Sequence, residues 1–159
     1  NHGSFAKNHN AEPYTMGELC GLPQMMWPTH CVENTKGSEF ADGLKTEKIN
    51  ATIHKGRNPN LDSYSGFGNR QNAQNFEETN LDRYLQNHEI TEVFVCGLAT
   101  DYCVKATALD AVENGYEATL LLSASRGVSE DGVKKAIDEM WTRGVTIDPT
   151  PLGLVKRVV

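Results

Sequence analysis

Residues 93–112, VFVCGLATDYCVKATALDAV, determine the fold expected for this chain. The stretch begins with four apolar residues, 93–96, a pattern typical of a strand buried on both faces. It ends with Val104, Ala108 and Val112, spaced four apart, which indicates one apolar face of a helix. The residues between them therefore form a tight turn from strand to helix, with Cys103 at its far end.

Cys103 is a candidate nucleophile because of this position. A side chain in the first turn of a helix lies near the positive end of the helix dipole and near unpaired backbone N–H groups. Both favour the thiolate, which is the nucleophilic form of cysteine. A small buried residue is the alternative role for a single cysteine, and the turn before Cys103 favours the nucleophile.

The rest of the chain alternates strands and helices. Further strands are expected at 49–54, 118–122 and 145–147. Helices are expected at 39–44, over about ten residues from Leu81, and after Ser129, where an apolar stripe runs from Val133 to Trp141. Residues 1–48 otherwise look irregular. This alternation predicts an α/β fold on a mostly parallel sheet, arranged as three α/β/α layers in a single domain spanning residues 1–159.

Composition restricts the partners of the protein. The chain has 159 residues, of which 38% are hydrophobic and 23% charged, as expected for one soluble domain with one core. The formal net charge of −6 and the lack of a basic cluster argue against binding to nucleic acid or to an anionic membrane. No apolar run reaches the length of a membrane span. The sequence leaves a homo-oligomer open.

Four cysteines occur at positions 20, 31, 96 and 103, and none of them forms a CxxC pair. Two lie in or beside the strand–helix unit of residues 93–112. This distribution favours free thiols and a reducing, cytoplasmic setting.

Lys55 and Cys103 are expected at the same edge of the sheet, because each follows a strand and parallel strands end on one side. A lysine there stabilises a thiolate or a developing anion. A solvated lysine at a strand end is the alternative. A Cys/His dyad with His54 competes with the lysine, but alternation along a strand directs His54 away from Lys55.

His30 and Trp27 have open roles on spacing alone. His30 with Cys31 could belong to a zinc site, but no second Cys/His pair follows at zinc-finger spacing. Trp27 is either a core aromatic or one wall of a flat pocket.

Three separated motifs resemble the nicotinamidase group of the isochorismatase-like cysteine hydrolases. Residues 97–104, GLATDYCV, resemble the nucleophile motif of this group, and residues 27–32, WPTHCV, resemble its metal-histidine motif. Lys55-Gly56, followed by YSGF at 64–67, resembles its lysine strand and pocket loop. The resemblance extends from about His2 to about Gly127, with the motifs in the family's order.

The resemblance implies a metal-dependent amidohydrolase that converts nicotinamide and water to nicotinate and ammonia in NAD salvage. Cys103 would be the nucleophile that forms a thioester, and Lys55 its cationic partner. The backbone N–H groups of Ala99 and Cys103 would form the oxyanion hole, next to a cis peptide between Leu98 and Ala99. Pyrazinamide-like amides would also be substrates.

The resemblance also implies a ring-binding pocket and a divalent metal ion. Trp27, Tyr64 and Leu98 would contact the substrate. His30 would bind the metal, joined by His2, and the metal would hold the pyridine nitrogen. Zinc is the first choice, with iron or manganese as alternatives, since His and carboxylate ligands suit all three.

One part of the family pattern is expected upstream of Asn1. The family's first strand ends in a catalytic aspartate, and its Asp-x-His metal pair should come just before Asn1. Asp101 and Asp62 are not substitutes, since Asp101 belongs to the nucleophile turn and Asp62 to a loop. Two alternative functions stay open: another small-amide hydrolase of the ureido or carbamoyl type, and a non-catalytic ligand-binding protein that retains the fold.

Overall fold

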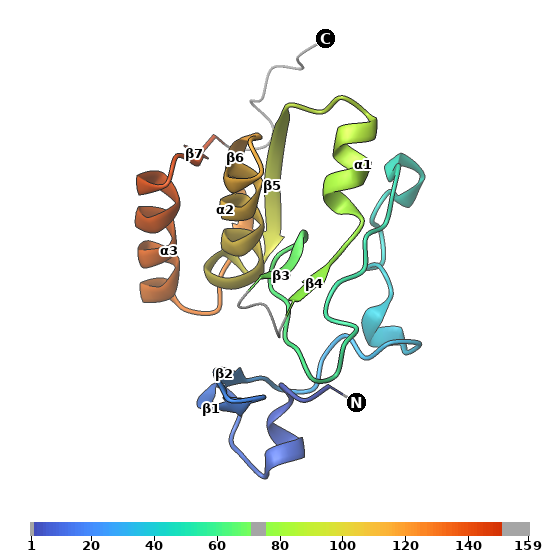
Figure 1. Ribbon diagram of the computed structural model, residues 1–159, viewed down its shortest axis with the longest axis vertical. Coiled ribbons are helices and arrows are strands. Elements are labelled where there is room, and N and C mark those ends of the chain that lie inside the picture. Colours follow the sequence, from blue (N-terminus) through green and yellow to red (C-terminus); the bar gives the residue numbers. More distant parts are fainter. Residues whose placement is uncertain (1, 71–75, 151–159) are drawn as a thin grey trace. The chain divides into compact units, whose positions relative to one another are not determined.

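A computed structural model of the chain describes residues 2–70 and 76–150 (Figure 1). The chain divides into two compact units, with the boundary between Asp62 and Ser63. Each unit is described by itself, and the single-domain organisation of residues 1–159 stays a prediction. None of the helices described in either unit has the length and apolarity needed to cross a membrane.

The second unit contains a parallel sheet, which confirms the predicted α/β class. Its strands are β5 (Glu92–Leu98), β6 (Glu117–Arg126) and β7 (Thr146–Asp148), in the order β5-β6-β7. Leu120 at the centre of β6 pairs with Val95 on one side and Ile147 on the other. The strands predicted at 118–122 and 145–147 therefore exist, and the first of them is longer than expected.

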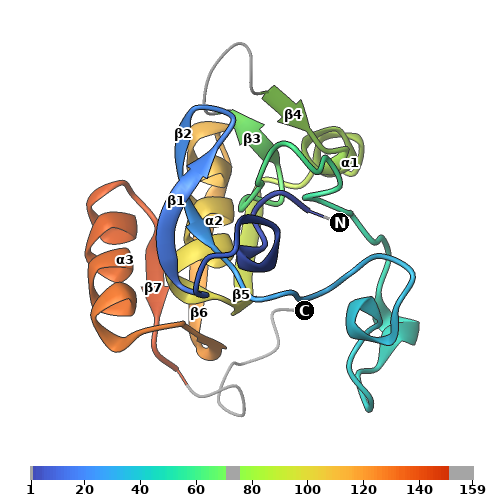
Figure 2. The same ribbon diagram turned by 90° about the horizontal axis from the view of Figure 1, so that it is seen from below.

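The described residues of this unit form three α-helices: α1 (Leu81–Asn87), α2 (Lys105–Glu113) and α3 (Glu130–Thr142). Helices α2 and α3 lie side by side in Figures 1 and 2. Ser129 caps α3, as predicted, since its hydroxyl accepts a hydrogen bond from the Gly132 N–H at 3.0 Å. Gly115, with φ +90°, follows the end of α2, in the left-handed conformation that glycine adopts without strain.

The core of the second unit lies where α2 and α3 meet the sheet. Small side chains on the helices allow close packing on the strands, and larger ones fill the remaining space. The buried residues include Ala108, Leu109, Ala111, Ala118, Leu120, Ala136, Met140 and Val145.

Two burial predictions in this unit are wrong. Val93 and Val95 pack against the core, but Phe94 on the opposite face of β5 is 56% exposed, so the strand is not buried on both faces. Trp141, at the end of the predicted apolar stripe, is 69% exposed. With about 100° between successive helical residues, Trp141 is rotated away from the core-facing Met140.

A short hairpin precedes α1. Its strands are β3 (Gly68–Arg70) and β4 (Phe76–Glu78), which pair antiparallel. Helix α1 is shorter than the ten residues predicted. The Thr79 hydroxyl accepts a hydrogen bond from the Leu81 N–H at 3.1 Å and so satisfies one of the free N–H groups at the start of the helix.

The first unit contains an antiparallel hairpin that the sequence reading missed. Strands β1 (Thr15–Leu19) and β2 (Leu22–Met26) are joined by Cys20 and Gly21 (Figure 2). Both connecting residues have positive φ, 51° and 81°, as a two-residue type I′ turn requires. Cysteine is an unusual first residue for such a turn, so the pair gave little signal.

Two predicted elements of the first unit are wrong. Residues 39–44 form no helix. The single turns of 3₁₀-helix lie at Ala6–His9, Lys36–Ser38 and Thr46–Lys48. Residues 49–54 form no strand, because a strand requires a hydrogen-bonded neighbour and this segment has none among the described residues.

Candidate active site

Cys103 lies in a helical turn directly after the end of β5. The peptide between Leu98 and Ala99 is cis, as the resemblance implied. The Ala99 carbonyl then accepts hydrogen bonds from the N–H groups of Tyr102, at 3.0 Å, and Val104, at 3.1 Å. The second bond spans five residues, so Thr100–Val104 forms a single π-helical turn that continues into α2. Cys103 is half-buried in this turn, where the sequence predicted it.

Ser125 on β6 supports the strand that leads into this turn. Its buried hydroxyl accepts a hydrogen bond from the Gly97 N–H at 3.3 Å and donates one to the Leu121 carbonyl at 2.9 Å. The pairing of β5 and β6 shifts register between Val95 and Gly97, and Gly97 has φ +114°. After the shift, Gly97 pairs with Ser125 and Leu98 with Arg126, so the irregularity lies just before the nucleophile turn, as bulges near active sites often do.

Asp101 joins the nucleophile turn to the start of α3. Its side chain is buried, and its two oxygens accept hydrogen bonds from the N–H groups of Val128, at 2.9 Å, and Ser129, at 3.2 Å. A Cβ atom at Gly132 would lie 2.5 Å from Asp101 Oδ2, so glycine there allows the close approach. This engagement agrees with the expectation that Asp101 does not replace the catalytic aspartate.

Tyr64 and Tyr102 come together beside the nucleophile. Their ring centres lie 5.6 Å apart with an edge-to-face angle of 61°. Burial raises the pKa of Tyr102, and the negative charge of Asp101 raises it further, so the phenol stays neutral. Tyr64 was predicted as a pocket residue, and the structure places it against the residue that precedes Cys103.

In the first unit, backbone pairing places the segment of His2 beside the segment of Trp27 and His30. The Trp27 carbonyl accepts a hydrogen bond from the Ala6 N–H, and the Trp27 N–H donates one to the Ser4 carbonyl, both at 2.8 Å. The Phe5 ring centre consequently lies 5.8 Å from that of His2 and 5.5 Å from that of His30.

Trp27 completes this aromatic cluster, with its ring centre 6.4 Å from that of His30. The structure thus brings together three residues that the resemblance had assigned to the ring pocket and the metal. Phe5, buried among them, was missed, because a single phenylalanine in an irregular segment carries no pattern.

His30 is arranged as a metal ligand would be. Its Nδ1 atom lies 2.7 Å from the Pro28 carbonyl oxygen and is therefore the protonated nitrogen. The lone pair then resides on Nε2, and a backbone carbonyl is a usual partner for the second nitrogen of a ligating histidine.

The ring of His2, the second predicted ligand, is hydrogen-bonded within the protein, and its metal role stays a prediction. Its Nδ1 accepts a hydrogen bond from the Ser4 N–H at 3.1 Å, and its Nε2 lies 3.3 Å from the Leu61 carbonyl. Both ring nitrogens therefore have protein partners. Across the described residues, no three or more His, Cys, Asp or Glu side chains are grouped to hold a metal ion. The described residues supply His30 as one fitting ligand and do not supply a complete site.

Lys55 lies in the first unit and Cys103 in the second. Lys55 is exposed and follows an irregular segment, not the strand that was predicted. Its assignment as the cationic partner of Cys103 therefore rests on the resemblance and stays a prediction, as do the roles of the other site residues.

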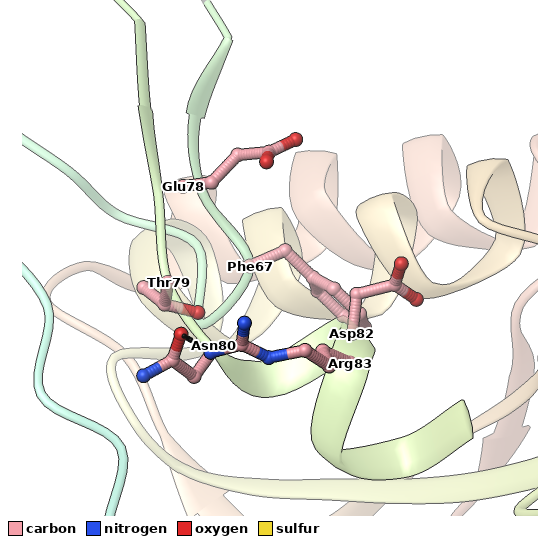
Figure 3. Close-up of a pocket in the computed structure, with 6 residues that line it drawn as sticks. All are labelled: Phe67, Glu78, Thr79, Asn80, Asp82 and Arg83. Carbon is pink, nitrogen blue, oxygen red and sulfur yellow. Dashed lines mark hydrogen bonds between the residues drawn. The ribbon is translucent and has the colours of Figure 1, made fainter. Parts of the chain in front are cut away.

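A polar pocket of about 240 Å³ lies beside the start of α1 (Figure 3). It is lined by Phe67, Glu78, Thr79, Asn80, Asp82 and Arg83. The Arg83 guanidinium donates a hydrogen bond to Asn80 Oδ1 at 2.6 Å, drawn in Figure 3. Asp82 accepts one from the Tyr116 hydroxyl at 2.7 Å. None of the predicted site residues lines this pocket.

Comparison with known proteins identifies the class. A family described as the isochorismatase domain matches residues 20–149. The nicotinamidase of Escherichia coli strain K12 is 47% identical over 150 residues, which are 92% of this chain and 68% of that protein. The nicotinamidase of Saccharomyces cerevisiae is 35% identical, over 92% of this chain and 73% of its own length.

Solved structures agree with these relatives. The yeast nicotinamidase bound to the inhibitor nicotinaldehyde superposes with a TM-score of 0.80 at 35% identity, covering 92% of this chain and 73% of that one. The pyrazinamidase of Pyrococcus horikoshii in complex with zinc has a TM-score of 0.67 at 34% identity, covering 93% and 68%.

The chain belongs to the isochorismatase family, whose model matches most of it. Within that family its similarity is to nicotinamidases, and the 35–47% identity to them over most of the chain makes it an amidohydrolase. The predicted family, fold class and enzyme class are therefore confirmed.

Proposed function

We propose that this protein hydrolyses nicotinamide to nicotinate and ammonia, with Cys103 as the nucleophile. The observation that carries the proposal is the position of Cys103 in the helical turn after β5, beside the paired rings of Tyr64 and Tyr102. Similarity to nicotinamidases supports the substrate.

The reaction proceeds in two steps. The Cys103 thiolate attacks the carboxamide carbon, the N–H groups of Ala99 and Cys103 stabilise the oxyanion, and the C–N bond breaks. The leaving nitrogen takes up a proton and departs as ammonia. Water then hydrolyses the thioester, which releases nicotinate and regenerates the thiol. Lys55 supplies positive charge near the thiolate.

The substrate ring lies among aromatic and apolar side chains in this proposal. Trp27 and Tyr64 would flank it, and Leu98, which is 75% exposed at the end of β5, is the third proposed contact. The nicotinaldehyde bound by the yeast nicotinamidase supports recognition of a pyridine ring. Pyrazinamide, which has a similar flat ring, is a second expected substrate.

His30 would contribute to a divalent metal site, with zinc as the expected ion. The zinc complex of the Pyrococcus pyrazinamidase and the free lone pair expected on His30 Nε2 support this. Such an ion would supply a Lewis acid for the ring nitrogen of the substrate. His2 is the second proposed ligand, and metal binding would replace one of its ring contacts with Ser4 or Leu61. We place the reaction in NAD salvage in the cytoplasm, in agreement with the four free thiols.

Ammonia release from nicotinamide by the purified protein tests the proposal. Cys103→Ala should abolish turnover, whereas Cys96→Ala, which removes an exposed thiol from the adjoining strand, should leave it unchanged. Turnover of N-carbamoyl substrates without nicotinamide turnover would favour the ureido-type alternative. Nicotinamide binding without any ammonia release would favour a non-catalytic ligand-binding protein.

A further inference from the structure

Thr107 connects the nucleophile turn to the loop that carries Tyr64. It lies on α2, four residues after Cys103, and its hydroxyl donates a hydrogen bond to the Cys103 carbonyl at 2.7 Å. The same hydroxyl accepts a hydrogen bond from the Gly66 N–H at 2.8 Å. One side chain thus contacts the backbone of the nucleophile and the backbone of the pocket loop.

The Gly66 peptide is held from its other side as well. Its carbonyl accepts a hydrogen bond from the Thr79 hydroxyl at 2.6 Å, and that hydroxyl accepts one from the Leu81 N–H at the start of α1. A Cβ atom on Gly66 would lie 3.1 Å from Leu81 Cδ2 and 3.4 Å from Thr107 Cγ2. The loop therefore packs closely between α1 and α2, and two threonine hydroxyls determine its position.

The position of Gly66 determines the position of Tyr64, two residues earlier. The buried Ser65 side chain, between them, accepts a hydrogen bond from the Phe67 N–H at 3.1 Å, which leaves this short segment little freedom. The Tyr64 ring then contacts Tyr102, the neighbour of Cys103. Thr107 is thus linked to Cys103 twice within one unit. One link is its direct hydrogen bond, and the other runs through Gly66, the Tyr64 ring and the Tyr102 ring.

We propose that Thr107 is a positioning residue that fixes the aromatic side of the substrate pocket relative to the nucleophile. It acts through the backbone of Gly66 and the ring of Tyr64, and its hydroxyl takes no part in the chemistry. Its role is to set how tightly a flat ring substrate is held beside Cys103. This inference rests on the proposed amidase function and assigns a specificity role within it.

A second threonine provides a matched control. Thr142 on α3 also donates its hydroxyl to the carbonyl four residues earlier, Asp138, at 2.8 Å. That bond is common for threonine inside helices. Thr142 lies at an exposed position, so Thr142→Val removes the same local bond without touching the pocket loop.

The test compares Thr107→Val, Thr107→Ser and Thr142→Val in the purified protein. Amide hydrogen exchange of residues 64–67 should accelerate in Thr107→Val alone. KM for nicotinamide should rise about tenfold in that variant, because losing a hydrogen bond to a partly buried backbone group has an effect of about this size, while kcat changes less. The rate of Cys103 alkylation by iodoacetamide should stay within about twofold of the wild-type rate. Thr107→Ser retains the hydroxyl, so its amide exchange, KM and alkylation rate should all be close to those of the wild-type protein.

Unchanged exchange of residues 64–67 in Thr107→Val would overturn the proposal, as would equal effects in Thr142→Val. If Thr107→Val does not fold, the wild-type protein provides the test, because rapid exchange of the Gly66 amide would show that Thr107 does not hold the loop. A wild-type protein that releases no ammonia from nicotinamide would refute the proposed function instead. The exchange measurement would still decide whether Thr107 fixes the loop.

Discussion

Replacing Asp101 by asparagine should weaken both the fold and the nucleophile turn. The buried carboxylate accepts two hydrogen bonds at the start of α3, from Val128 and Ser129. A hydrogen bond to a charged group contributes about 1.5–3 kcal/mol. Asparagine retains one oxygen and turns an NH₂ group towards the other donor, so one bond is lost and the remaining one is no longer charge-assisted. We expect a loss of about 2–3 kcal/mol, or about 5–10 °C in Tm for a chain of this size.

Asp131→Asn is the matched control, because it also removes one negative charge near the start of α3, from the first turn of the helix itself. Asp131 is exposed, and its ion pair with Lys134 is long, at 3.9 Å. Its loss should cost less than about 1 kcal/mol. Urea unfolding followed by circular dichroism measures both variants. Equal destabilisation of the two variants would show that helix-dipole charge, not the paired hydrogen bonds, explains the role of Asp101.

Asp101→Asn should also reduce turnover, because the Asp101 carboxylate fixes the turn that contains Cys103. Small displacements of a reacting group cost up to about a hundredfold in rate, so kcat should fall by about ten- to a hundredfold. The pKa of Tyr102 should also decrease, since the charge of Asp101 contributes to raising it. A stable Asp101→Asn protein with wild-type turnover would refute the positional role.

Further predictions concern four side chains. Cys103 should react faster with iodoacetamide near neutral pH than the other three cysteines, as a peptide map of early labelling would show, and faster labelling elsewhere would contradict its assignment. Lys55→Ala should lower kcat about a hundredfold or more with the fold intact. Lys55→Arg should restore little of it, because a planar guanidinium does not replace a compact ammonium. Near-normal turnover in either variant would remove Lys55 from the mechanism. His30→Ala should reduce zinc content and raise KM for nicotinamide more than it lowers Tm, and full metal occupancy in the variant would rule His30 out as a ligand. Burial, and after it the hydrogen bond to Asp82, raises the pKa of Tyr116 from 10.0 to about 12. The stability that the protonated phenol contributes should be complete below pH 10 and lost as the pH rises through about 12. Unfolding measured across this pH range should show the decline in the wild-type protein and not in Tyr116→Phe.

The sequence by itself determined the elements that depend only on residues close to one another in the chain. The strand, turn and helix around Cys103 follow from apolar periodicity, and Ser129 and Gly115 mark a helix start and a helix end by their own chemistry. The three short motifs, at 27–32, at 55–56 with 64–67, and at 97–104, allowed the family to be recognised together. These features were predictable because each one is encoded within about ten consecutive residues.

Other features of the candidate site were decided by tertiary structure. Residues 49–54 have β-branched side chains, yet form no strand, because pairing depends on a partner that local pattern does not specify. The approach of the His2 segment to Trp27 and His30 likewise depends on backbone pairing between separated segments.

Thr107 shows the physical reason most clearly. From the sequence it is an ordinary helical threonine four residues after the nucleophile. Its second hydrogen bond joins it to Gly66, 41 residues earlier in the chain. Such a contact forms only when α2 and the pocket loop pack together, because the local sequence of neither segment specifies the other. The residues proposed to carry the chemistry were therefore predicted from the sequence, whereas the contacts that hold them in position became visible only in the folded protein.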